Sequence, residues 1–133
     1  MNRPDHQQLP SALRTHARGL FCIEAAVELL IGHWSWLRRE DFTTTFIRTS
    51  PELTNGAIVA HVDWPVAITA LDAGHLPCSG GERRILRIAA SVADGIPVDL
   101  RDALTGLDTT NTTLVTQAIT HAAGHHSQLH KMR

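Results

Sequence analysis

The feature that most constrains the fold is a run of residues between positions 11 and 37 that is apolar on two sides of one expected helix. One side repeats with the 3.6-residue period of an α-helix, through Leu13, Ala17, Leu20, Ile23, Val27, Leu30, Ile31 and Trp34. The other side carries Phe21, Cys22, Ala25 and Leu29. Such a helix must lie at the centre of a bundle or against a second chain. We expect one long central helix, about 40 Å in length unless Gly19 breaks it.

The part of this run from Leu20 to Leu37 is long enough to raise the question of a membrane span, and its polar residues argue against one. Glu24, Glu28 and His33 lie within it and are costly in lipid. The first twelve residues are polar and do not resemble a signal peptide. Cys22 and Cys78 are isolated from each other and form no CxxC pair, which favours a reducing compartment. We expect a cytoplasmic protein that does not enter membranes.

Length and composition predict a single domain with its own core. The chain has 133 residues, of which 43% are hydrophobic, which is enough to fold without disulfides or metals. Its net charge is −1, from 12 basic and 13 acidic residues, so it has no overall attraction for nucleic acid or anionic lipid. We expect a flexible arm over residues 1–10, one helical domain over 11–124 and a histidine-rich tail over 125–133.

Capping signals divide the remainder into short helices. Asp63, Asp99 and Asp108 each precede a helical pattern, and Ser79 with Glu82 forms a capping box. A further short helix is expected over residues 41–50. At most one short extended segment is expected near 57–62, with no evident partner strand. The predicted fold class is therefore all-α, a compact bundle of five to six helices.

Residues 98–119 permit two interpretations, a DNA-reading helix-turn-helix or two core helices joined by a glycine turn. The DNA-reading hypothesis uses side chains that would point outward: Thr109, Thr110, Asn111, Thr113 and Gln117. Against it, the expected second helix has no Arg or Lys for phosphate contacts. We favour the core-helix interpretation, which predicts that Leu104 is buried, that Gly106 is left-handed and that Thr113 and Gln117 face water.

Residues 78–84 match the C-x5-R spacing of a cysteine phosphatase loop. A thiolate of Cys78 at a helix start, with Arg84 and backbone amides, could hold a phosphate. That loop follows a buried strand in the phosphatases, whereas a helix end and a loop are expected before Cys78 here. Glu82 would also repel a phosphate. We keep a cysteine phosphatase as a remote alternative only.

Histidines and glutamates supply the remaining candidate ligands. His121 and His125 are one helical turn apart and are a weak candidate for a metal site, since no third ligand lies nearby in sequence. Glu24 and Glu28 are also one turn apart, and we expect them to pair with arginines of a neighbouring helix, with Arg83, Arg84 and Arg87 as candidates. No cofactor and no bound metal are predicted.

Large apolar residues of the first helix are the candidates for a partner interface. We expect this interface to include Phe21, Leu29, Trp34 and Trp36. Tryptophan is enriched among the residues that anchor protein interfaces. The simplest explanation for the tryptophans of this chain is nevertheless that they belong to the core.

The segment LPCSGGERRILRIAASVADGIPVDLRDALTGLD, residues 76–108, resembles a recurring block of small actinobacterial proteins that have no assigned activity. Weaker similarity extends through DWPVAITALDAG before it. The resemblance implies a small helical protein and assigns no functional residue.

Taken together, the residues favour a non-enzymatic helical protein that acts through protein–protein contact as a regulatory or accessory factor. The partner is another protein or a second copy of the chain, which would make it a homodimer. A helix-turn-helix DNA-binding regulator that uses residues 98–119 is the alternative.

Overall fold

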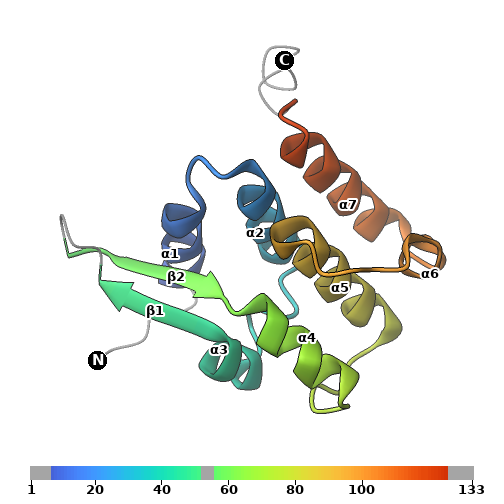
Figure 1. Cartoon of the computed structure of the whole chain (residues 1–133), viewed down its shortest axis with the longest axis horizontal. Coiled ribbons are helices and arrows are strands. Elements are labelled where there is room, and N and C mark those ends of the chain that lie inside the picture. Colours follow the sequence, from blue (N-terminus) through green and yellow to red (C-terminus); the bar gives the residue numbers. More distant parts are fainter. Residues whose placement is uncertain (1–6, 52–55, 126–133) are drawn as a thin grey trace.

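The computed structural model describes residues 7–51 and 56–125 (Figure 1). These residues form seven α-helices and one two-stranded antiparallel sheet. The chain is thus mostly helical, as predicted, but the sheet was not expected. No helix in the described part is long and apolar enough to cross a membrane.

The elements follow one another with short connections. In chain order they are α1 (Gln8–Ala17), α2 (Phe21–His33), α3 (Glu40–Phe46), β1 (Ile47–Pro51), β2 (Ile58–Val62), α4 (Trp64–Asp72), α5 (Gly80–Asp94), α6 (Leu100–Leu104) and α7 (Thr109–Ala122).

The expectation of one long helix over residues 11–37 is wrong, because the chain breaks at Gly19. Gly19 has a φ of +85°, which is a left-handed conformation that L-residues avoid. Leu20 is extended and serves as the N-cap of α2, so α1 and α2 are separate helices. The expected arm over residues 1–10 is also too long, since α1 already begins at Gln8. Pro10 fits there because first-turn residues have no intrahelical hydrogen bond to lose.

Helix α2 is the central element. Its residues Ala25, Ala26, Val27, Leu29 and Leu30 are at most 3% exposed, although they do not share one face. α1, α5 and α7 pack around this helix, and Figure 1 shows it between α1 on one side and α5 and α7 on the other. The two-sided apolar pattern is therefore covered within a single chain.

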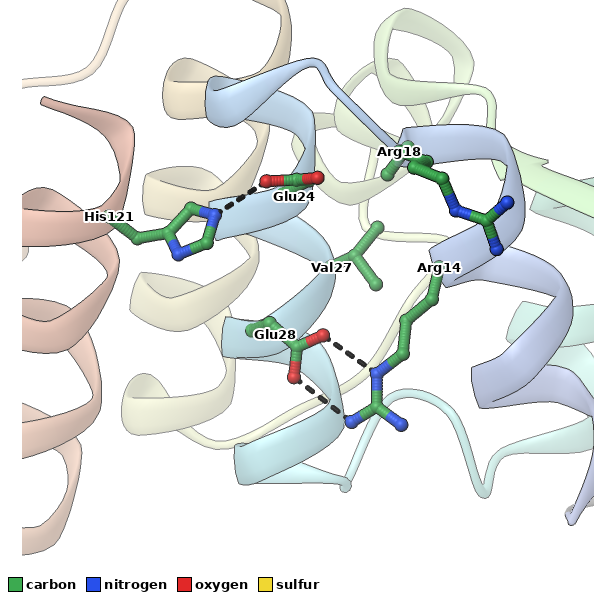
Figure 2. A pocket seen from close by; sticks show the side chains of 7 residues that line it. Arg14, Arg18, Glu24, Val27, Glu28 and His121 are labelled. Atoms are coloured by element: carbon green, nitrogen blue, oxygen red, sulfur yellow. Dashed lines mark hydrogen bonds and ion pairs between the residues drawn. The ribbon is translucent and has the colours of Figure 1, made fainter. Parts of the chain in front are cut away.

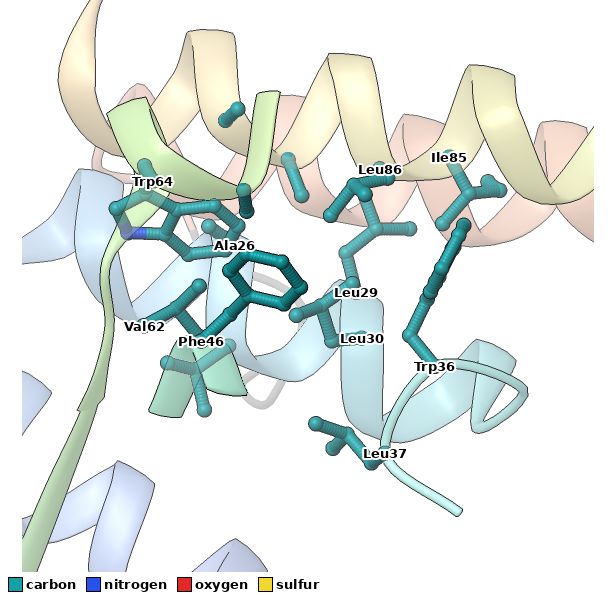
Figure 3. Packing of buried hydrophobic residues seen from close by; sticks show 14 of the residues in the cluster. Ala26, Leu29, Leu30, Trp36, Leu37, Phe46, Val62, Trp64, Ile85 and Leu86 are labelled. Carbon is teal, nitrogen blue, oxygen red and sulfur yellow. The ribbon is translucent and has the colours of Figure 1, made fainter. Parts of the chain in front are cut away.

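An aromatic cluster from the residues that follow α2 completes the hydrophobic core. Trp36 is fully buried, and its indole N–H donates to the backbone carbonyl of Glu82 in α5 over 2.8 Å. Its ring lies 5.2 Å from the ring of Phe42, which in turn lies 5.5 Å from that of Phe46. Figure 3 shows Trp36 against Ile85, with residues of α2, β2 and α4 completing the core. The indole would leave an unsatisfied donor here without this carbonyl partner.

The sheet replaces the second half of the helix that was expected over residues 41–50. α3 ends at Phe46 and the chain continues directly as β1, whose Ile47 pairs with Val62 of β2. Ile47 and Val62 are both buried, whereas Arg48 and His61, the next pair along the sheet, are exposed. β2 packs on α1. Pairing of the two strands thus places Ile47 and Val62 in the core together.

The capping signals are confirmed. Asp63, Asp99 and Asp108 each accept a hydrogen bond from a first-turn amide of α4, α6 and α7, and Ser79 with Glu82 forms the complete capping box of α5. These local signals correctly place four helix starts.

Because Gly19 is left-handed, we expect two glycine substitutions to differ in their effect on the free energy of unfolding. Gly19→Ala should lower the free energy of unfolding by about 1–2 kcal/mol, since a Cβ strains this backbone although no atom lies within 4 Å of it. Gly81→Ala in α5 is the control, because its Cβ would make only ordinary contacts, and it should change stability by less than about 0.5 kcal/mol. Denaturant unfolding of both variants measures the difference. Equal losses would contradict the account of the turn.

Candidate functional site

The best-defined charged site is a pocket between α1, α2 and α7, which we call the α1–α2–α7 pocket (Figure 2). Its volume is about 550 Å³, within the range of small-molecule sites. It is lined by Arg14, Ala17, Arg18, Glu24, Val27, Glu28 and His121. The structure therefore brings Glu24, Glu28 and His121, which the sequence singled out separately, to one place.

Glu24 connects three parts of the chain. One carboxylate oxygen lies 2.7 Å from Nε2 of His121 in α7, and the other accepts the backbone N–H of Gly19 over 2.9 Å. The side chains of Glu24 and His121 are 24% and 23% exposed. The carboxylate thus fixes both the turn between α1 and α2 and the position of α7. A partly buried bond of this kind is stronger than one in open solvent.

Glu28 pairs with an arginine, but not with one of those expected. Both of its oxygens bind Arg14 of α1, at 2.7 Å and 3.0 Å, and Figure 2 shows this bidentate arrangement. The expected partners lie elsewhere: Arg87 binds Asp72, and Arg84 donates to the carbonyl of Asp102. α1, rather than α5, packs against this face of α2, because the break at Gly19 folds α1 back along it.

The pocket has charged groups for binding, and it holds one carboxylate beside an imidazole. A carboxylate beside an imidazole can orient it as a proton acceptor. However, none of the described lining residues is a serine, cysteine, threonine or lysine that such a base would activate. Arg18 forms no hydrogen bond or ion pair with the described residues, so its guanidinium is available to an anion. The arrangement accounts for the attachment of α1 and α7 to α2.

Arg14 and Arg18 were not among the sequence-predicted candidates. They are four residues apart on α1, a spacing that places two side chains on one helix face. That spacing was the available signal. It could not show that Glu24 and Glu28 would lie opposite, since this depends on the packing of α1 on α2.

The weak metal candidate receives no support from the described residues. His121 faces Glu24, whereas His125 is exposed beyond the end of α7. Within residues 7–51 and 56–125, no group of three or more histidine, cysteine or acidic side chains is placed to hold a metal. The remaining histidines of the expected tail lie outside the described residues.

The segment around Cys78 lacks the architecture of a phosphatase loop. Residues 73–79, between α4 and α5, contain no strand. Burial raises the pKa of the Cys78 thiol and Glu82 raises it further, although nearby arginines oppose this. A phosphatase needs the opposite shift to form a thiolate. Arg84 is turned to the carbonyl of Asp102.

The segment over residues 98–119 differs from both interpretations in detail. Leu104 is 48% exposed, so the expectation that it is buried is wrong. Gly106 has a φ of +93°, as expected. Asn111, which the DNA-reading hypothesis required to point outward, is only 9% exposed. The other residues of that hypothesis are exposed, namely Thr109, Thr110, Thr113 and Gln117.

Two of the four expected interface residues lie inside the core. Leu29 is 2% exposed and Trp36 is fully buried, because α5 and α7 cover the second side of α2. Trp34 is half-buried. Phe21 remains 45% exposed, with its ring edge-on to that of His121 at 6.0 Å. Of these four residues, only Phe21 and Trp34 are accessible to another molecule.

Two alanine substitutions on α2 separate the roles of its glutamates. Glu24→Ala should lower the free energy of unfolding by about 1–2 kcal/mol, because it removes two hydrogen bonds from a partly buried carboxylate. Glu28→Ala removes an exposed ion pair, with side chains 53% and 47% exposed, and should cost less than about 1 kcal/mol. Thermal or denaturant unfolding compares them. A larger loss in Glu28→Ala would refute this assignment.

The two cysteines should differ in reactivity. At neutral pH iodoacetamide should alkylate exposed Cys22 faster than Cys78, because burial and a raised pKa keep Cys78 as the thiol. The rate at Cys78 should increase as the pH rises into the alkaline range. Peptide mass spectrometry follows both sites, with an aryl phosphate assay as the functional control. Faster alkylation of Cys78, or phosphatase turnover lost in Cys78→Ser, would restore the phosphatase hypothesis.

The chain matches no protein-family model, no curated protein sequence and no solved structure. The geometry and chemistry of its own residues therefore carry the functional argument.

Proposed function

We propose that the protein is a non-enzymatic accessory protein that acts through protein–protein contact, and that this contact joins two copies of the chain along α7. The observation that carries the proposal is an outward helix face without charge. Residues 109–120 of α7 contain no Asp, Glu, Lys or Arg. Depletion of charge distinguishes the core of protein interfaces from ordinary surface.

Threonines form the centre of this surface, which we call the α7 face. The 3.6-residue period places four of them in one stripe: Thr109, Thr113, Thr116 and Thr120. The hydroxyls of the last three donate to the carbonyl four residues earlier, at 3.1, 2.8 and 3.0 Å. Because these donors already have partners in the helix, removing them from water costs less than removing free hydroxyls.

Exposed apolar side chains occur on α7 and on the helix that precedes it. Ile119 on α7 is 56% exposed, and Leu100 and Leu104 on the preceding helix α6 are 60% and 48% exposed. Leu100 and Leu104 are four residues apart, and α6 lies beside the start of α7 in Figure 1. Burying such side chains in an interface stabilises it by about 25 cal/mol per Å² of apolar area. The uncharged threonine stripe alone does not provide this stabilisation.

A second copy is the partner that the charge distribution favours. A two-fold axis would place the α7 face against itself, so any charged residue on it would meet a like charge. None is present, and the net charge of −1 gives little repulsion between copies. The two-sided apolar pattern of residues 11–37 is no longer a reason to expect a dimer, because the apolar sides of α2 are covered within the chain.

The alternative of a DNA-binding regulator has less support. α7 has no arginine or lysine, and phosphate contacts supply most of the affinity of proteins for DNA. Asn111, the residue best suited to pair with adenine, lies inside the protein.

Introducing charge at the centre of the α7 face tests the proposal. Sedimentation equilibrium from about 1 μM to about 1 mM should detect a dimer, and Thr116→Glu should raise its dissociation constant at least about ten-fold through like-charge repulsion. Thr45→Glu is the matched control, since Thr45 is an exposed helical threonine of α3, and it should leave association unchanged. Both variants should keep the wild-type melting temperature at concentrations where the wild type is monomeric.

A wild-type chain that remains monomeric over the whole range contradicts the proposal. Equal weakening by the α7 and α3 variants also contradicts it, because the effect would then report net charge rather than a specific face.

A further inference from the structure

A second pocket, which the proposed function does not use, lies between the end of α2 and the first turns of α5 and α7. Its volume is about 740 Å³. Most of its lining is polar and includes His33, Ser79, Gly81, Glu82, Asp108 and Asn111. We call it the polar pocket. Two helix starts and one helix end that are far apart in sequence meet here.

Asn111 offers the polar pocket a side-chain amide whose hydrogen-bonding groups are not used by the described residues. It is the one polar residue in the buried core of the described chain, with 9% exposure. Its backbone N–H donates to Oδ1 of Asp108 over 2.7 Å, but its side-chain amide forms no hydrogen bond with the described residues. A Cβ added to Gly81 would lie 3.6 Å from Nδ2 of Asn111, so the amide lies over the start of α5. The amide is not fully enclosed, so its unused donor and acceptor can reach a ligand in the pocket.

His33 also lines the pocket and adds a second unpartnered group. Its Nδ1 is buried and has no hydrogen-bond partner among the described residues. Burial lowers the pKa of His33, against the opposing effect of Glu82 and Asp108. The ring is therefore uncharged at neutral pH, and Nδ1 can either donate or accept a hydrogen bond according to its tautomer.

The charges around the polar pocket nearly balance. Glu82 and Asp108 are acidic, and each caps a helix whose N-terminus carries about half a positive charge. The guanidinium of Arg84 lies beside Gly106, with Cζ 3.5 Å from where a Cβ would be. An anion in the pocket would meet two carboxylates, and a cation would meet two helix N-termini. An uncharged ligand avoids both conflicts.

The available hydrogen-bonding groups are a mixture of donors and acceptors. First-turn amides of α5 and α7, such as those of Gly81 and Thr110, have no acceptor within their helices. Each capping carboxylate uses one oxygen at its helix, Glu82 for the N–H of Ser79 and Asp108 for that of Asn111. The second oxygen of Asp108 has no partner among the described residues and can accept a hydrogen bond. A hydroxyl group both donates and accepts and therefore suits such a lining.

We propose that the polar pocket binds a small uncharged polyhydroxy compound of the monosaccharide class, with Asn111 and His33 as its buried hydrogen-bonding partners. A planar heterocycle fits less well, because it needs an aromatic or apolar face to stack on. Among the lining residues only His33 has a ring. The inference is independent of the α7 face and stands or falls separately from it.

Amide chemical shifts measured during titration test this assignment in the intact chain. D-Glucose, D-galactose and myo-inositol serve as polyhydroxy probes, and inorganic phosphate and adenosine as the probes of other classes, each up to about 100 mM. At least one polyhydroxy probe should shift the amides of Gly81, Thr110 and Asn111 saturably. Phosphate and adenosine should not.

Two leucine substitutions on α7 provide the matched comparison. Asn111→Leu removes the buried amide and should weaken binding at least about ten-fold. Gln117→Leu makes the same chemical change at an exposed position outside the pocket and should bind as the wild type does. His33→Phe keeps a ring without Nδ1, serves as the second variant where Asn111→Leu fails to fold, and should also weaken binding.

Three results would overturn the proposal. The first is no saturable shift with any polyhydroxy probe, which would leave water as the occupant. The second is stronger binding of phosphate or adenosine at the same amides. The third is unchanged affinity in a folded Asn111→Leu or His33→Phe variant.

Discussion

The structure depends on the burial of α2 from several sides at once. A helix whose Ala25, Ala26, Val27, Leu29 and Leu30 are all nearly inaccessible cannot rest on one neighbour, because these residues do not share a face. α1, α5 and α7 must all pack on it. The break at Gly19 makes this arrangement available, since it lets the preceding segment fold back as a separate helix. A continuous helix would have left one apolar side for another molecule.

The polar residues of the central segment lie at the boundaries between these packed helices. Glu28 pairs with Arg14 of α1, and Glu24 binds both the Gly19 turn and His121 of α7. His33, at the end of α2, faces the pocket at the starts of α5 and α7. Each polar group thus lies where α2 meets a neighbour, and the apolar residues between them fill the core. Both pockets follow from this geometry, because they form where the covering helices diverge.

Local signals were reliable wherever a few neighbouring residues decide the conformation. Asp63, Ser79, Asp99 and Asp108 begin helices as expected, because a cap satisfies amides within its own first turn. Burial was less predictable. Leu104 was expected inside and is exposed, whereas Asn111, which only the DNA-reading alternative placed outside, is buried. Glu24, Glu28 and His121 were recognisable as chemically active residue types, but their partners could not be named. Pairing depends on which helices become neighbours.

The sequence by itself determined the mostly helical character, four helix starts and the exclusion of a membrane span over residues 20–37. These properties depend on periodicity, capping and composition, which act over a few turns. Only the tertiary structure decided that residues 47–51 pair with residues 58–62, that α2 is covered within one chain, and that Asn111 and His33 border one pocket. Such outcomes require contacts between residues far apart in the chain. The free energy that stabilises these contacts comes from surfaces that bury each other. No local sequence pattern specifies which surfaces will meet.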